Sequence, residues 1–380
     1  MGKIYYFDNA ATTYPKPEKV YAAIDRANRE NAFNAGRGSY NVANEASEMI
    51  SSCRNKLVSL FDSEGVVFEP SATLALNAII MGLDWSSPKN VYVSPYEHNA
   101  VIRPLYKHNK GNDIRILPVK EDGTIDLDKL KIQFSNAKPD YVFLTHVSNV
   151  TGYILPIEAI CQLAHSYDAI VVVDCAQSAG LLETKLSAFN ADFIVFAGHK
   201  TLYASFGIAG FAYGKSIKSL TSVFAGGTGS DSLNMSMPMD APARFEAGSY
   251  NIPAIAGLSA ALDWRSTLPA DQVTFVKEQE LTRQLIYGLL ENRKLKVYWS
   301  GDIKNHISVV SINHRDYMAD ELASILDQDF HIAVRSGYHC APLVHDVIDT
   351  KSKRGTVRLS IGHFTTSEDV AYVIQALKEL

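Results

Sequence analysis

Four cysteines in 380 residues are too few and too widely spaced to form a disulfide framework or a metal-binding knuckle. The chain has no excess of basic residues: its formal net charge is -5 and its pI is about 6.1, which disfavours binding to nucleic acid or to an anionic membrane. No apolar run is long enough to span a membrane, and residues 1–4 lead directly into the polar Asp8-Asn9, unlike a secretory signal peptide. We therefore expect a cytoplasmic protein without a bound metal and without a nucleic-acid or membrane partner.

Short apolar runs alternate with helix-like segments over residues 60–215. The runs that predict strands are 66–68, 91–93, 114–117, 141–144, 170–173, 193–196 and 208–213. Helices are expected between most of them, for example over 126–137 and 156–167. This alternation predicts an α/β fold whose mainly parallel sheet is covered by helices on both faces.

The pattern changes after residue 262 to a mixture of helices and short strands. Helices are expected over 269–291, 318–326 and 367–380, and strands at 296–298, 307–312, 332–334 and 357–360. With 47% hydrophobic residues the chain can bury one large core and a smaller one. We expect a large domain over 15–262 and a small α+β domain made of 1–14 and 263–380, with a reactive loop at residues 334–342.

Two polar residues end neighbouring apolar runs of the large domain. Asp174 follows the run 170–173, and Lys200 follows the run 193–196 in a His-Lys pair. In a parallel sheet both would lie at carboxyl ends of strands, where α/β proteins bind their ligands. A lysine amine can form a Schiff base with a carbonyl cofactor, and a carboxylate can keep a pyridine nitrogen protonated. The pair therefore predicts pyridoxal 5'-phosphate (PLP).

Other polar residues at strand ends are consistent with this cofactor. Ser71-Ala72-Thr73 opens an apolar helix, so its backbone N–H groups predict a phosphate site, although an ordinary helix cap has the same pattern. Gln177 and Asn149 could reach the phenolic O3′ of the ring, and His98 could stack on its face. Each of these residues taken singly is more often a structural group, and the prediction depends on their convergence at one edge of the sheet.

Cys340 lies in a loop bounded by Gly337 and Pro342. Free cysteines are mostly small core residues, but Arg335 and His339 add positive potential that favours a thiolate here. We therefore predict that Cys340 is a nucleophile. Arg358 is an arginine within an apolar strand, and it either faces solvent or clamps the α-carboxylate of an amino acid.

These segments together resemble the cysteine desulfurase and selenocysteine lyase family of class V (fold-type I) PLP enzymes. The similar segments occur in the order of the family at 6–13, 71–73, 97–98, 145–152, 173–177, 198–200, 244–249 and 335–341. The resemblance covers nearly all of the chain. It implies a mainly parallel seven-stranded sheet in the large domain and an α+β C-terminal domain that carries the nucleophile.

The resemblance also implies how the cofactor is held. Lys200 would form the Schiff base, Asp174 would pair with the pyridinium nitrogen, and His98 would stack on the ring and be available as a proton donor. The further expected contacts are Gln177 and Asn149 at O3′, Ala72, Thr73 and His199 at the phosphate, and Ser249 at the phosphate of a neighbouring subunit. A homodimer is therefore expected.

The same resemblance implies the substrate site and the reaction. Arg358 would bind the substrate carboxylate; the other residues expected in the pocket are Ala10, Arg37, Asn149 and Arg335. Cys340 would take the sulfur of L-cysteine as a persulfide, leaving L-alanine, and pass it to a protein or small thiol. Its short loop is similar to the group II (SUF-like) desulfurases.

The sequence departs from the family pattern at several positions. Ala197 replaces a serine, Ser249 a threonine and Asn99 a histidine, and Tyr203-Ala204-Ser205 replaces a Gly-Pro turn in a loop that is one residue longer. These features are similar to a side branch of the family. A selenocysteine lyase, a C–S β-lyase or an aminotransferase on the same scaffold, and a non-catalytic scaffold protein, stay open as alternatives.

Overall fold

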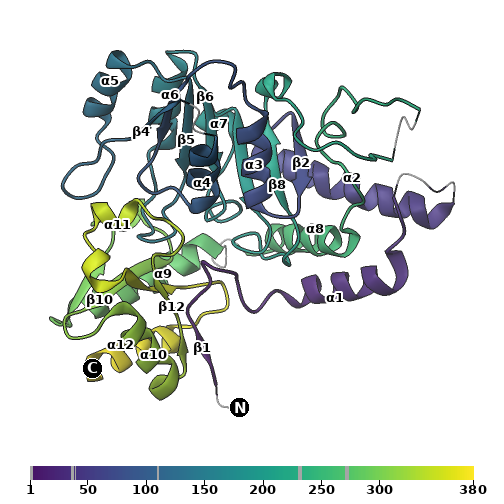
Figure 1. The fold of residues 1–380 in the computed structure, drawn as a ribbon. Coiled ribbons are helices and arrows are strands. Elements are labelled where there is room, and N and C mark those ends of the chain that lie inside the picture. The colour runs from purple at the N-terminus through teal and green to yellow at the C-terminus, as the bar shows by residue number, and fades with distance from the viewer. Residues whose placement is uncertain (1–2, 36–37, 39, 109–110, 230–232, 270–273) are drawn as a thin grey trace.

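A seven-stranded sheet forms the centre of the larger part of the molecule (Figure 1). The structure is a computed structural model that describes residues 3–35, 38, 40–108, 111–229, 233–269 and 274–380. The strands of this sheet are β2 (Gly65–Glu69), β3 (Asn90–Val93), β4 (Asp113–Ile116), β5 (Tyr141–Thr145), β6 (Ile170–Asp174), β7 (Phe193–Ala197) and β8 (Ala209–Tyr213). Their order is β2-β8-β7-β6-β5-β3-β4. The seven predicted strands are thus confirmed.

The sheet is mainly parallel, as predicted, because β3 to β7 all run in one direction. β8 is antiparallel to both β7 and β2. The connection from β7 to β8 explains the reversal. It contains only residues 198–208 and no helix, whereas a parallel crossover needs a dozen or more residues. The turn after β7, which carries Lys200, is therefore a hairpin-like loop at the edge where the parallel strands end.

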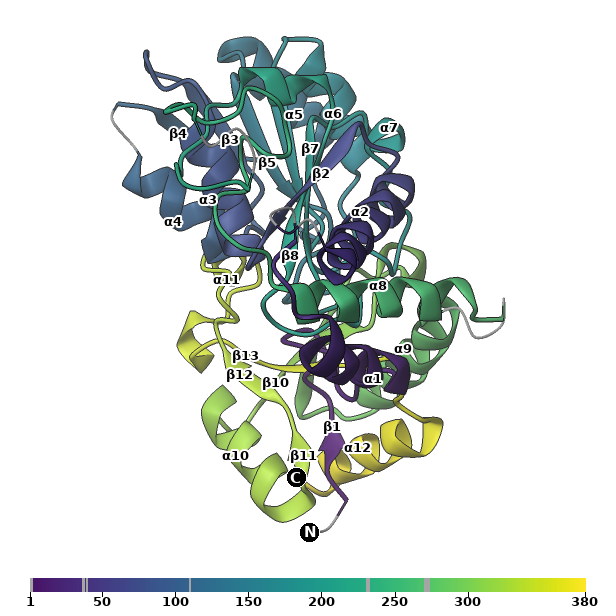
Figure 2. The same ribbon diagram turned by 90° about the vertical axis from the view of Figure 1, so that its right-hand side faces the viewer.

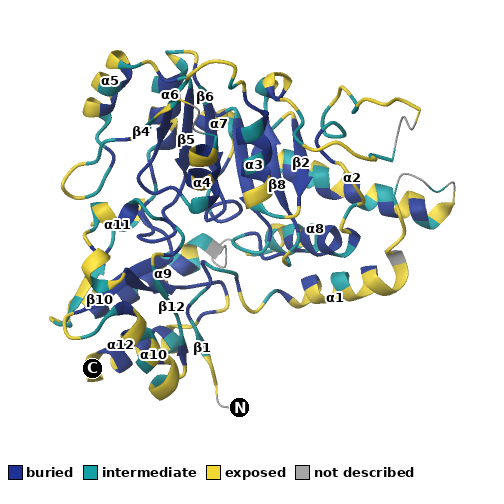
Figure 3. Ribbon diagram, viewed as in Figure 1, coloured by how far each residue is buried: buried dark blue, intermediate teal, exposed yellow. Residues whose placement is uncertain are grey.

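Helices cover both faces of the sheet (Figure 2). Alternate strand residues serve the two faces: Val66 and Phe68 contribute to one core and Val67 to the other. The first face is covered by α2 (Asn41–Phe61), α5 (Leu127–Asn136), α6 (Ile157–His165) and α8 (Ile252–Ser266), and the second by α3 (Ala72–Gly82) and α4 (Asn99–Lys107). Two further helices are α1 (Glu18–Arg26), which packs on α8, and the short α7 (Leu186–Phe189). The strands are accordingly buried almost throughout, except for the edge strand β4, which is partly exposed (Figure 3).

A second, smaller sheet lies beside the first, with both chain ends next to it (Figures 1 and 2). Its four strands are all antiparallel, in the order β12 (Arg335–Gly337), β13 (Thr356–Ser360), β10 (Val309–His314) and β9 (Leu295–Tyr298). The N-terminal β1 (Tyr5–Tyr6) pairs separately with β11 (Ile332–Ala333). The helices of this part are α9 (Thr274–Leu290), α10 (Ala319–Phe330), α11 (Val344–Val347) and α12 (Ser367–Glu379).

The second sheet has a hydrophobic core of its own, which includes Phe7 from the N-terminal segment. One local expectation was wrong. Arg335–Gly337 is not loop but strand β12, because its backbone pairs with β13 and sets Arg335 opposite Arg358. In the part of the chain that the structure describes, no helix combines the length and the apolar character needed to cross a membrane.

Candidate active site

The carboxyl ends of the parallel strands surround a cavity of about 240 Å³. Of the residues predicted for the site, those that line it are Ala10, Ala72, Thr73, His98, Asn149, Asp174, Gln177, His199, Lys200, Arg335 and Arg358. They come from both sheets and from the N-terminal segment. Segments that are up to 350 residues apart in sequence therefore meet here, as the hydrogen bond from the Arg358 side chain to that of Asp8 illustrates.

Lys200 and Asp174 line this cavity from the carboxyl ends of neighbouring strands. Asp174 is the last residue of β6, and Lys200 follows β7, which pairs with β6 in parallel. Burial lowers the pKa of the Lys200 amine to about 8, opposed by the carboxylate of Asp174. Burial also raises the pKa of Asp174, opposed by the Ala176 N–H that its Oδ1 accepts and by Lys200. The lowered pKa increases the fraction of the amine that is in its neutral, nucleophilic form near neutral pH.

The phosphate end predicted from the sequence has the expected donors. Ser71 caps α3 by accepting the N–H of Leu74 at 3.3 Å, so the helix-cap interpretation of this segment is correct. The same helix start brings Ala72 and Thr73 to the cavity wall. His199 stacks on Phe206, and its Nδ1 is buried without a hydrogen-bond partner. A phosphate at the start of α3 would give that nitrogen a partner.

Three polar side chains at the predicted ring position are already engaged with backbone groups. Gln177 Nε2 donates to the carbonyl of Ala10 at 2.8 Å, and Asn149 Nδ2 donates to the carbonyl of His339 at 2.7 Å. His98 Nδ1 accepts the N–H of Ala100 at 3.0 Å, which leaves the ring proton on Nε2 when the ring is neutral. Burial, followed by the charge of Lys200, lowers the pKa of His98 to about 4. His98 is therefore neutral at pH 7.

Arg358 does not face solvent: its side chain is only 1% exposed. Nη2 donates to Asp8 Oδ1 at 2.6 Å, and Nη1 donates to the carbonyl of Asn149 at 3.1 Å. Nε is buried and has no partner. A buried guanidinium with an unused N–H at the cavity is suited to a carboxylate. The sequence analysis did not identify Asp8 as the counter-ion of Arg358. The only indication in the sequence was that Asp8 is an acidic residue within the segment 6–13, which resembles the family.

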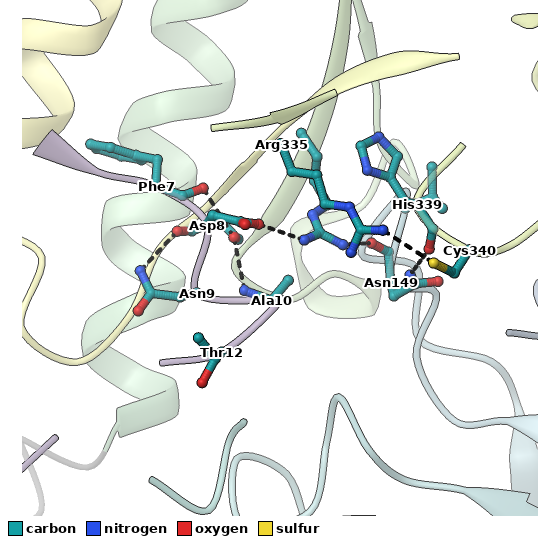
Figure 4. A network of polar contacts seen from close by, with 12 residues as sticks. Phe7, Asp8, Asn9, Ala10, Thr12, Asn149, Arg335, His339 and Cys340 are labelled. Carbon is teal, nitrogen blue, oxygen red and sulfur yellow. Dashed lines mark hydrogen bonds and ion pairs between the residues drawn. The ribbon is translucent and has the colours of Figure 1, made fainter. Parts of the chain in front are cut away.

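Cys340 lies beside Arg335, which lines the cavity (Figure 4). Arg335 Nη2 donates to Cys340 Sγ at 3.1 Å, a contact that stabilises negative charge on the sulfur. Cys340 is partly exposed, whereas the other cysteines (Cys53, Cys161 and Cys175) are buried. The thiol therefore combines access with a cationic neighbour, which a core cysteine lacks.

The backbone around the thiol is held in an uncommon conformation. His339 and Cys340 both have left-handed φ angles, 48° and 57°. Two contacts fix them: Asn149 holds the carbonyl of His339, and the N–H of Asn99 donates to the carbonyl of Cys340 at 2.7 Å. Such backbone strain persists where the surroundings impose it and is frequent at functional sites.

Neither Ser249 nor Cys340 is among the residues that line this cavity. Ser249 lines a separate cavity of about 370 Å³, together with Glu246 and Tyr250. Arg37 lies outside the described residues. Within the described part of the chain, no group of three or more His, Cys, Asp or Glu side chains is arranged to hold a metal ion.

A lysine, a carboxylate and a helix start that line one cavity at the carboxyl ends of parallel strands are typical of PLP-dependent α/β enzymes. The family model for class-V aminotransferases matches residues 5–373, and the chain belongs to that family. Enzymes of this family depend on PLP, and the free His199 Nδ1, the Asp174 carboxylate and the Lys200 amine of this cavity fit that group.

Named relatives cover the full length of the chain. A probable cysteine desulfurase of Methanothermobacter thermautotrophicus is 30% identical over 99% of this chain and 94% of its own length. One of Vibrio cholerae is 32% identical over 98% of this chain and 93% of its own length. Among solved structures, the apo cysteine desulfurase of Thermococcus onnurineus superposes with a TM-score of 0.89 at 27% identity, over 99% of this chain and 94% of its own.

Proposed function

We propose that the protein is a PLP-dependent cysteine desulfurase that converts L-cysteine to L-alanine and takes the sulfur onto Cys340 as a persulfide. The observation that carries this proposal is the contact between Arg335 Nη2 and Cys340 Sγ, 3.1 Å, at the edge of the cavity that contains Lys200. A β-lyase or an aminotransferase needs the lysine but not an activated thiol. The cysteine desulfurases among the relatives support the same conclusion.

The cofactor is proposed to be held by the residues that line the cavity. Ala72, Thr73 and His199 would bind its phosphate, and Asp174 would pair with its ring nitrogen. The remaining amide atoms of Gln177 and Asn149 would face O3′, and the imidazole of His98 would stack on the ring. When bound, PLP supplies an aldehyde for amine chemistry and a ring that accepts electron density from the substrate's α-carbon.

The residues of the chain would then act in sequence. The Arg358 N–H groups hold the substrate carboxylate, with Ala10 and Arg335 beside it, and the neutral Lys200 amine removes the α-proton. Cys340 attacks the substrate sulfur as a thiolate. A sulfur–sulfur bond forms, the carbon–sulfur bond breaks with its electron pair left on the β-carbon, and that carbon takes up a proton. Lys200, protonated in the first step, returns a proton to the α-carbon. His98 Nε2–H would donate a hydrogen bond within the same cavity, and the products are alanine and a persulfide.

We also infer the organisation in which this chemistry takes place. The core around Phe7 supports a small domain made of residues 1–14 and 263–380, with residues 15–262 as the PLP-binding domain. The separate position of Ser249 supports a homodimer in which it completes the phosphate site of the other subunit. The nucleophile lies close after β12, in keeping with a short group II (SUF-like) loop, and its sulfur would pass to a thiol acceptor. A fully active monomer in sedimentation would contradict the dimer.

Product analysis tests the proposed function. PLP-loaded protein given L-cysteine and a reducing thiol should form equal amounts of alanine and sulfide, measured by chromatography and by a sulfide assay. Selenocysteine offered in parallel shows which chalcogen is preferred. Pyruvate and ammonia in place of alanine would show that the protein is a β-lyase and would overturn the proposal.

A further inference from the structure

Tyr203 closes the turn that presents Lys200. Its backbone N–H donates to the carbonyl of Lys200 at 2.8 Å, and the N–H of Ala204 donates to the carbonyl of Gly198 at 2.8 Å. Tyr203 has a φ of 59°, in the left-handed region, which is unfavourable for a residue with a bulky side chain. A residue held in this conformation needs stabilising contacts elsewhere. The side chain of Tyr203 provides them.

The phenol of Tyr203 bridges two segments of the C-terminal part of the chain. It donates to Glu278 Oε1 at 3.2 Å and accepts the N–H of His363 at 2.6 Å. Ser308 donates to Glu278 Oε2 at 2.5 Å, and Lys277 Nζ donates to the carbonyl of His363 at 2.6 Å. The turn after β7 is thereby attached to the start of α9 and to the segment that follows β13.

The Tyr203 and Glu278 side chains that form this bridge are buried. Tyr203 is only 2% exposed and Glu278 4%, and the ring of Trp264 lies 5.2 Å from that of Tyr203. The positive charges of Lys277 and Arg265 act on Glu278, and Arg265 Nη1 is buried without a hydrogen-bond partner among the described residues. Removing the phenolic hydroxyl would take away the acceptor of the bond from the His363 N–H and the donor of the bond to Glu278 Oε1. Water would then be drawn toward the turn.

We propose that Tyr203 is a positioning residue whose hydroxyl fixes the turn of residues 198–204 against α9 and so sets the place of the Lys200 amine in the cavity. The proposal rests on the proposed function only for its kinetic consequence. Its structural part concerns the lysine itself and is measurable without cofactor. It assigns a role to the segment Tyr203-Ala204-Ser205, in which the sequence departs from the family pattern.

Tyr203→Phe keeps the ring and removes the hydroxyl. Tyr153→Phe is the matched control, because its buried hydroxyl also accepts a backbone N–H, from Ile125 at 3.3 Å, outside the cavity. In cofactor-free protein, the rate at which acetic anhydride labels Lys200 is followed against pH by peptide mass spectrometry. The wild type should titrate near the Lys200 pKa of about 8. Tyr203→Phe should titrate at a higher pH, toward an exposed amine, and Tyr153→Phe like the wild type.

In the loaded enzyme, Tyr203→Phe should lower kcat for L-cysteine about tenfold with KM within about twofold, because a displaced amine slows proton transfer more than it weakens binding. Wild-type labelling and kcat in Tyr203→Phe would overturn the positioning role and leave the proposed function intact. A shifted labelling titration in Tyr203→Phe, combined with a wild type that forms no alanine, would support the positioning role and overturn the proposed function. If Tyr203→Phe does not fold, Glu278→Gln is tested in its place. This variant should lower kcat about threefold, and an unchanged kcat would contradict the proposal.

Discussion

Replacement of Lys200 by alanine is expected to abolish turnover of L-cysteine, with a decrease in kcat of at least about a thousandfold. Lys200 lines the cavity, and its amine, near Asp174, has a pKa lowered to about 8. Without it the cofactor has no covalent attachment, and the substrate's α-proton has no base. The measurement is steady-state formation of alanine, with bound cofactor followed by its visible absorbance.

The control for this variant is Lys185→Ala. Lys185 is exposed and pairs with Glu183 outside the cavity, so its loss should change neither absorbance nor turnover. Activity in Lys200→Ala above about one-tenth of the wild type would show that another group is the base and would contradict the assignment of the cofactor lysine.

Replacement of Cys340 by alanine should reduce sulfide and alanine formation at least about a hundredfold while leaving cofactor binding unchanged. The reason is geometric: Cys340 lies at the edge of the site, and the residues proposed to hold the cofactor come from other segments. The measurement is product formation beside the cofactor content of the purified variant. Cys161→Ala, which removes a buried thiol from α6, is the control and should keep its activity.

Two outcomes of that experiment would require revision. Wild-type desulfuration by Cys340→Ala would show that this thiol is not the nucleophile. Loss of cofactor together with activity would show that the Cys340 side chain has a structural role, since the variant keeps the backbone carbonyl that accepts the Asn99 N–H. With selenocysteine as substrate the variant is expected to retain more activity, because selenium leaves carbon more readily than sulfur does.

The central sheet could be predicted from sequence because each buried strand is a continuous apolar run. A strand buried on both faces has no polar positions, so runs such as 170–173 and 193–196 are recognisable without any knowledge of their neighbours. The convergence of Asp174 and Lys200 follows from the same fact, because parallel strands end at one edge. The reversed direction of β8 was not predicted, since it depends on the length of a connection rather than on the strand itself.

The rest of the site depends on contacts that local sequence patterns do not encode. The pairing of Arg358 with Asp8 joins residues at opposite ends of the chain, and periodicity says nothing about such a partner. Arg335 was expected in a loop, whereas it lies in strand β12. The strand was not predicted because three residues are too few to show the alternation of apolar and polar side chains. The left-handed backbone at His339 and Cys340 is imposed by contacts with Asn149 and Asn99, and neither residue favours it locally.

The most direct test of a persulfide route through Cys340 is mass spectrometry of the protein after a single exposure to L-cysteine without a reducing thiol. PLP-loaded wild type, treated and then alkylated, should give a peptide containing Cys340 that carries one additional sulfur atom, with one alanine formed per modified chain. Peptides containing Cys53, Cys161 and Cys175 should be unchanged, because those thiols are buried. Alanine formed while the Cys340 peptide stays unmodified would contradict the account.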